Sequence, residues 1–179
     1  MKKHIQIIAG ILIMFATSSL LAQSNNAIKK LTQSIRSHKN MEVSFTYQTV
    51  GDPNDTEEVK EGKAYFQDKA YKLIMEDQHA ISNGKTTWHY IIEDKEVMVG
   101  DASDDDNPFT ILDDLERDSS GITPIFDQKG NLKRLEVEID EGVKIILSNI
   151  EMKFDQDLKD SFFTFDEKAY PDVEVIDMR

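Results

Sequence analysis

Hydrophobic residues recur first at the spacing of a helix and then at the spacing of strands. Ile28, Leu31 and Ile35 stand three and four residues apart, behind a polar stretch that can cap a helix. This pattern predicts an amphipathic helix over 24–38. From Val43 onward apolar residues alternate with polar ones, so a strand is predicted directly after the helix.

Similar alternation continues through most of the chain, interrupted by clusters of turn residues. Further strands are predicted at 58–66, 70–75, 80–81, 87–92, 97–99, 121–126, 132–139, 142–149 with 150–154 as a continuation, and 173–178. The pair Asn83-Gly84 is the strongest turn signal, and a tight hairpin with both residues at positive φ is expected there. A second, short amphipathic helix is predicted from a cap at Asn107 to about Arg117.

These elements amount to eight to ten short strands and two amphipathic helices. Strands that follow one another closely in sequence pair antiparallel. A flat sheet of this size would leave long edges and an uncovered apolar face. The expected fold class is therefore mainly β (α+β): a half-open, strongly curved antiparallel β-barrel or sheet with an amphipathic helical lid.

The first 22 residues have the pattern of a secretory signal peptide. Lys2 and Lys3 precede an apolar run over 5–21. A transmembrane anchor is the alternative, but the strongly apolar part, 5–15, is much shorter than the roughly 20 residues that a bilayer requires. Cleavage is expected after Ala22 or a few residues upstream, and no cysteine is present for lipid attachment. The mature protein is therefore expected in the periplasm, free of an anchor.

The expected mature chain is a single domain, 23–179, with a strongly acidic balance. The sequence has 21 basic and 34 acidic residues, and removal of the signal takes away two lysines, so the net charge becomes 19 − 34 = −15. Binding to nucleic acid or to anionic lipid surfaces is disfavoured by this charge. The absence of cysteine excludes disulfides, thiolate metal sites and thiol nucleophiles.

Patterns that would support catalysis or metal binding are weak. His38, His79 and His89 have neither a chelating spacing nor a recognisable Ser-His-acid arrangement. The acidic run 101–106 lacks the glycine and the distal Glu of an EF-hand, so a solvated loop is favoured over a cation site. Glu57 and its acidic neighbours lie in a polar turn where nothing would raise a carboxyl pKa. No enzymatic activity, metal or cofactor is expected.

Apolar and aromatic side chains are the more prominent feature of the predicted sheet and second helix. The candidate cavity residues are Phe45, Tyr47, Tyr65, Leu73, Met75, Trp88 and Tyr90 on strands, and Phe109, Ile111, Leu112 and Leu115 on the second helix. A solid core has the same binary pattern as a cavity, so periodicity leaves both interpretations open.

Four strings occur in a characteristic order along nearly the whole mature chain. They are EVSFTY at 42–47, ISNGKTTWHY at 81–90, NPFTIL at 107–112 and FTFD at 163–166. In this order they resemble the LolA family of periplasmic lipoprotein carriers. The closing string YPDVEVID at 170–177 resembles the variant found in Bacteroidetes-type bacteria.

The resemblance implies a half-open barrel with a helical lid over an apolar cavity that holds lipoprotein acyl chains. It also implies lid contacts at Ile28, Leu31 and Ile35, and at Lys69, which stands where better-known members have an Arg that fastens the lid. Implied partners are lipoproteins, an inner-membrane lipoprotein-releasing transporter and an outer-membrane acceptor, with the carrier a monomer. Two alternatives stay open: a LolA-like lipid- or lipoprotein-sensing adaptor without transfer activity, and, with less support, a hydrolase.

Overall fold

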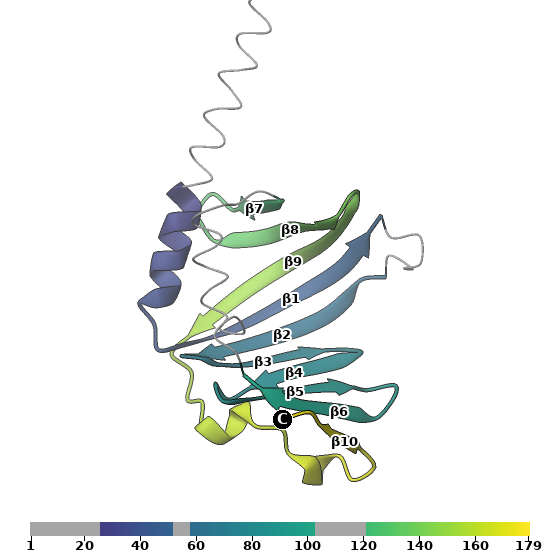
Figure 1. Cartoon of the computed structure of the whole chain (residues 1–179). Coiled ribbons are helices and arrows are strands. Elements are labelled where there is room, and N and C mark those ends of the chain that lie inside the picture. Colours follow the sequence, from purple (N-terminus) through teal and green to yellow (C-terminus); the bar gives the residue numbers. More distant parts are fainter. Residues whose placement is uncertain (1–25, 52–57, 103–120) are drawn as a thin grey trace, which may run out of the picture.

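One curved sheet with a helix at its margin forms the part of the chain that the structure describes (Figure 1). This computed structural model describes residues 26–51, 58–102 and 121–179. The predicted signal peptide and the predicted helix from Asn107 lie outside these ranges. The first predicted helix is present over 26–36. None of the helices in the described ranges combines the length and the apolar character that crossing a membrane requires.

Ten strands make up the sheet in these described ranges. They are β1 (Asn40–Val50), β2 (Lys60–Gln67), β3 (Ala70–Met75), β4 (Gln78–Ser82), β5 (Thr86–Ile91), β6 (Glu96–Asp101), β7 (Ile122–Phe126), β8 (Leu132–Asp140), β9 (Val143–Phe154) and β10 (Glu174–Asp177). Two short 3-10 turns, Asp160–Phe163 and Glu167–Ala169, lie between β9 and β10. The predicted strands are therefore confirmed, with small shifts at their ends.

The strand order is β10-β6-β5-β4-β3-β2-β1-β9-β8-β7. β1 to β6 follow one another as an antiparallel meander, and β7 to β9 form a second meander whose last strand pairs with β1. The expected antiparallel pairing of strands adjacent in sequence is confirmed, and the exception in the sheet is β10, which lies parallel to β6. The long connection over 155–173 brings the chain to the end of the sheet where β6 begins, so that β10 and β6 start side by side. A long crossover of this kind permits parallel pairing.

The hairpin between β4 and β5 differs from its prediction in one detail. Positive φ occurs at Gly84 (φ 82°) but not at Asn83. The two central residues of the turn are Gly84 and Lys85, since the backbone N–H of Asn83 donates to the carbonyl of Thr86 (3.2 Å). Asn83 stands before them, and its side-chain Oδ1 accepts from the N–H groups of Lys85 and Thr86, both at 2.9 Å. An Asn that bonds the backbone this way stabilises a turn without left-handed φ.

A β-bulge in β9 keeps its apolar residues on one face of the sheet. The register against β1 shifts between Ser44 and Thr46, where β9 has one extra residue, and Asn149 there has φ 52°. An extra residue reverses the alternation of side chains along a strand. The residues at 145 and 147 before the bulge and those at 150 and 152 after it therefore line the same cavity.

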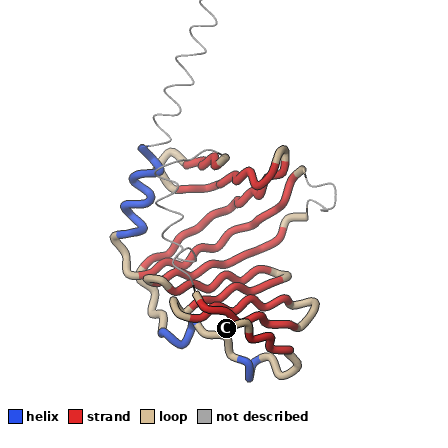
Figure 2. Tube along the Cα trace, viewed as in Figure 1, coloured by secondary structure: helices blue, strands red, loops and turns tan. Residues whose placement is uncertain are grey.

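Apolar residues pack on both faces of the sheet. We call the face that carries helix 26–36 the inner face and the opposite one the outer face. The inner cluster joins Ile35 to residues of β1, β2, β8 and β9, whereas the outer cluster joins Ile81, Tyr90 and Val97 to Phe165 of the C-terminal segment. Figure 2 shows the two 3-10 turns of that segment at the opposite end of the sheet from helix 26–36. The inner face is thus covered at one end and the outer face at the other.

Candidate functional site

An apolar cavity of about 590 Å³ lies between the inner face and helix 26–36. Its apolar walls come from the helix and from β1, β2, β3, β7, β8 and β9. The apolar residues that line it are Ile28, Leu31, Ile35, Met41, Val43, Phe45, Ala64, Phe66, Leu73, Met75, Pro124, Leu132, Leu135, Ile145, Leu147, Ile150 and Met152. Sites that enclose drug-sized ligands span roughly 300–1,000 Å³, so the space is large enough for a ligand.

Helix 26–36 presents one apolar stripe to this cavity. Ile28 and Ile35 are only 3% and 5% exposed, and both line the cavity together with Leu31. Residues at this spacing lie on one side of a helix. The helix ends against the sheet, where Nδ1 of His38 lies 2.7 Å from Oδ2 of Asp155 and the N–H of Lys39 donates to Oδ1 of the same residue (3.0 Å). The helix therefore forms one side of the cavity, and the contacts of Asp155 hold its C-terminal end against the sheet.

Seven of the residues singled out in the sequence line this cavity. They are Phe45, Tyr47, Leu73 and Met75 from the strands and Ile28, Leu31 and Ile35 from the helix. Phe109, Ile111, Leu112 and Leu115 lie outside the described residues. The structure therefore brings predicted residues from β1, β3 and helix 26–36 together around one cavity.

Tyr65, Trp88 and Tyr90 lie away from the cavity, contrary to their grouping in the sequence. Tyr65 neighbours the cavity residue Ala64 on β2, and successive strand residues face opposite sides. Its ring packs edge-on against Phe162, with 4.8 Å between centroids. The other two belong to the outer cluster. Whether Trp88 and Tyr90 face the same side of the sheet as Leu73 depends on the registers of β3 with β4 and of β4 with β5. The sequence of a single strand does not reveal these registers.

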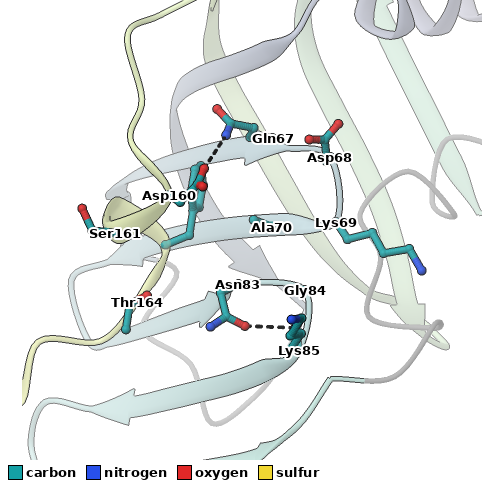
Figure 3. A pocket seen from close by; sticks show the side chains of 11 residues that line it. Gln67, Asp68, Lys69, Ala70, Asn83, Gly84, Lys85, Asp160, Ser161 and Thr164 are labelled. Carbon is teal, nitrogen blue, oxygen red and sulfur yellow. Dashed lines mark hydrogen bonds between the residues drawn. The ribbon is translucent and has the colours of Figure 1, made fainter.

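Lys69 does not line the cavity either. It stands in the β2–β3 turn beside a separate pocket of about 540 Å³, lined mainly by polar residues (Figure 3). Nε2 of Gln67 donates to Oδ1 of Asp160 across this pocket, at 3.4 Å. A lid contact by Lys69 stays a prediction.

Sequence reasoning missed the walls that β8 and β9 contribute. Leu135, Ile145 and Leu147 occupy alternate strand positions, a signal that was available. By simple alternation Ile150 and Met152 would face the opposite side of the sheet from Ile145 and Leu147. The bulge at Asn149 turns them to the cavity. Strand alternation alone therefore assigns half of β9 to the wrong face.

One end of the cavity is polar. Glu58, Lys60, Asp77 and Gln78 line it there together with Tyr47. Nζ of Lys60 lies 3.8 Å from Oδ2 of Asp77. Burial, followed by the charges of Asp77 and Glu76, raises the pKa of Tyr47 to about 12. The phenol is thus neutral and keeps its proton at physiological pH.

Each of the three histidines within the described residues contacts a neighbouring side chain. His38 stacks on Phe154 with ring centroids 4.2 Å apart, and His79 meets the ring of Tyr90 edge-on at 5.7 Å. Burial, aided by the charge of Lys72, lowers the pKa of His79. Nε2 of His89 bonds the side chain of Gln78. Within 26–51, 58–102 and 121–179, no group of three or more His, Asp or Glu residues is placed to hold a metal ion.

The ring of Phe45 in the cavity wall packs directly over Gly62, where there is no room for a side chain. A Cβ at Gly62 would lie 2.5 Å from Cε2 and 2.7 Å from Cζ of Phe45. Gly62→Ala is therefore expected to displace this ring and to destabilise the protein by about 1–3 kcal/mol in urea denaturation. Gly100→Ala is the matched control, because its nearest atom, Oγ1 of Thr87, would lie at 3.3 Å. Equal stability of the two variants would show that Phe45 does not depend on Gly62.

Comparisons with known proteins give similarity in structure alone. No protein-family model matches this sequence, and neither does any curated protein. An uncharacterized conserved protein from Thermus thermophilus is 11% identical, with 76% of this chain and 90% of that chain covered and a TM-score of 0.46. A LolA superfamily protein from Nitrosomonas europaea is 10% identical, with 80% and 98% covered and a TM-score of 0.45. A DUF1329 family protein from Desulfovibrio piger is 10% identical, with 83% and 98% covered and a TM-score of 0.41. At such identities no residue's role transfers from these proteins to this chain.

Proposed function

We propose that this protein is a periplasmic carrier that holds the acyl chains of lipoproteins in its inner-face cavity and delivers them to the outer membrane. The observation that carries the proposal is that a half-open apolar cavity of about 590 Å³ lies between the sheet and helix 26–36. A core that served stability alone would be filled by its own side chains, because protein interiors pack as densely as organic crystals. The order of the sequence strings that resemble LolA carriers supports the same function.

The energetics of an acyl chain explain why such a cavity is useful. Burial of each CH₂ group is worth about 0.8 kcal/mol, so a chain of ordinary length cannot cross an aqueous compartment unprotected. A carrier must offset much of that cost and still release its cargo. Aliphatic walls such as Leu73, Leu135 and Ile145 supply burial without a directional bond that would hold the ligand in place.

Helix 26–36 is the element of the described chain best suited to act as a lid. Ile28, Leu31 and Ile35 contribute to the cavity wall, so movement of the helix would exchange contacts within the protein for contacts with the ligand. Exchange of this kind lets a ligand shift an equilibrium between closed and open states. The hydrogen bonds of Asp155 to His38 and Lys39 would serve as the fixed point of that movement.

Under this proposal an inner-membrane lipoprotein-releasing transporter loads the protein and an outer-membrane acceptor unloads it. The acidic surface, at a formal net charge of −13 for the full sequence, suits basic docking surfaces on such partners. The protein acts as an exported monomer without a cofactor.

Protein purified from periplasm is expected to carry lipid or lipoprotein. Native mass spectrometry and lipid extraction measure this directly, with delipidated and reloaded protein as the control. Reconstituted transfer to acceptor membranes then separates a carrier from a sensing adaptor, since an adaptor would bind cargo and retain it. Repeated absence of lipid, together with no binding of an acyl probe, would contradict the proposal.

A further inference from the structure

The hydroxyl of Tyr47 is a buried polar group inside an apolar site. The residue is only 8% exposed and lines the cavity. Its Oη has no hydrogen-bond partner among the described residues. A buried polar group without a partner carries a desolvation penalty, and such groups are uncommon in folded proteins. The hydroxyl is therefore a candidate contact for a polar atom of a ligand.

The surroundings of this hydroxyl define the kind of ligand atom that fits. Asp77 and Glu76 lie beside the phenol, where their charges act on it and where the side chain of Asp77 and the backbone of Glu76 come near its hydroxyl. Neither contact meets the distance and angles of a hydrogen bond. Among the described residues, these two and Glu58 make three acids near the polar end of the cavity, against one base, Lys60. A neutral phenol donates one hydrogen bond, and an anionic acceptor would be repelled by the surplus of acids. A neutral acceptor is favoured.

The cavity is also asymmetric along its length. Met41, Val43 and Phe45 come first on β1, and the polar lining residues Gln48 and Thr49 follow Tyr47 on the same strand. Tyr47 therefore stands where the apolar wall of β1 gives way to a polar one. An amphiphile has the same change of character at the carbonyl that joins its acyl chain to its head group.

Building on the proposed function, we propose that Tyr47 donates a hydrogen bond to the neutral carbonyl of an acyl ester at the junction between the bound chain and its head group. The ester groups of acylated lipoproteins and of phospholipids share this chemistry. Free fatty acids do not, because they present a carboxylate to the acids at this end of the cavity.

The test uses three ligands with the same twelve-carbon chain: 1-lauroylglycerol, 1-dodecylglycerol and laurate. The ester has the carbonyl, the ether lacks it, and laurate replaces the neutral ester with an anion. Affinities are measured on the full mature protein by displacement of N-phenyl-1-naphthylamine. The wild-type protein is expected to bind the ester about 3–10-fold more tightly than the ether, as one added hydrogen bond predicts, and to bind laurate more weakly than the ester.

Tyr47→Phe removes the hydroxyl and keeps the ring. This variant is expected to lose the preference for the ester and to bind the ether as well as the wild type does. Without ligand it is expected to melt at the same temperature as the wild type or about 2–4 °C higher, because a buried polar group without a partner has been removed. A dilauroyl lipopeptide and a dilauroyl phospholipid provide the same ester from the two sources, and loss of affinity for either one on Tyr47→Phe supports the inference.

Four outcomes would overturn it, and they separate its failure from that of the proposed function. Equal affinity of the wild type for ester and ether, or an ester preference that persists in Tyr47→Phe, excludes the hydrogen bond while the cavity still binds chains. A clearly lower melting temperature for ligand-free Tyr47→Phe shows that the hydroxyl already has a partner, such as Asp77. If neither neutral ligand displaces the dye from the wild type, the proposed function fails and the role of Tyr47 fails with it.

Discussion

Leu73→Trp is expected to lower the affinity for an acyl probe by at least about tenfold while the protein stays folded. Leu73 lines the cavity and is paired with Ala64 on β2 and Ala80 on β4, two small neighbours that leave room for a larger side chain. An indole ring there would occupy space that the ligand needs. Displacement of two CH₂ groups costs about 1.6 kcal/mol of binding free energy, which corresponds to more than tenfold in affinity. Titration with a fluorescent fatty acyl probe measures the change.

Ile74→Trp is the matched control for this experiment. Ile74 is the next residue of β3, so its side chain points to the outer face, where it is paired with Lys63 and His79. The same change of size one residue away is expected to alter probe affinity less than about twofold, since the residue makes no part of the cavity wall. If both variants bound the probe as the wild type does, the inner-face cavity would not be the binding site.

Phe165→Ala is expected to cause a large loss of stability, about 3–5 kcal/mol, as is typical for a buried Phe. Phe165 is 6% exposed and packs in the outer cluster, where its ring lies 5.6 Å from that of Tyr90 and is stacked on that of Tyr170 at 5.0 Å. Removal of the ring would leave a cavity between the sheet and the C-terminal segment. Urea denaturation followed by fluorescence reports this loss directly, because Trp88, the single tryptophan, packs against the same cluster.

Phe162→Ala serves for comparison, since Phe162 is only half-buried and packs at the side of Tyr65. It is expected to cost less than Phe165→Ala. Both variants are expected to bind the acyl probe with wild-type affinity under conditions where they are folded, because the outer cluster and the cavity lie on opposite faces of the sheet. Loss of probe binding by folded Phe165→Ala, as severe as that of Leu73→Trp, would show that the two faces are not independent.

The elements of this fold could be predicted from local patterns because each is encoded by neighbours in sequence. Alternation of apolar and polar residues locates strands such as β3 at Ala70–Met75, where prediction and structure agree. The spacing of Ile28, Leu31 and Ile35 identifies the helix and also the face that it buries. Short turns between strands make antiparallel neighbours the expected arrangement, which the meander from β1 to β6 confirms.

The assignment of side chains to the two faces of the sheet could not be predicted in the same way. Tyr47 and Tyr90 have the same alternating surroundings in sequence, yet the first lines the cavity and the second packs in the outer cluster. The difference accumulates through the register of every hairpin between them, and a shift of one residue moves a whole strand's side chains to the other face.

The sequence by itself determined the strands, the amphipathic helix and the strength of the apolar pattern, because these depend on residues close together in the chain. Only the tertiary structure decided that the inner face carries a half-open apolar cavity and that the C-terminal segment packs on the outer face. Packing density depends on how distant surfaces fit together, and a filled core and an empty cavity have the same order of apolar and polar residues.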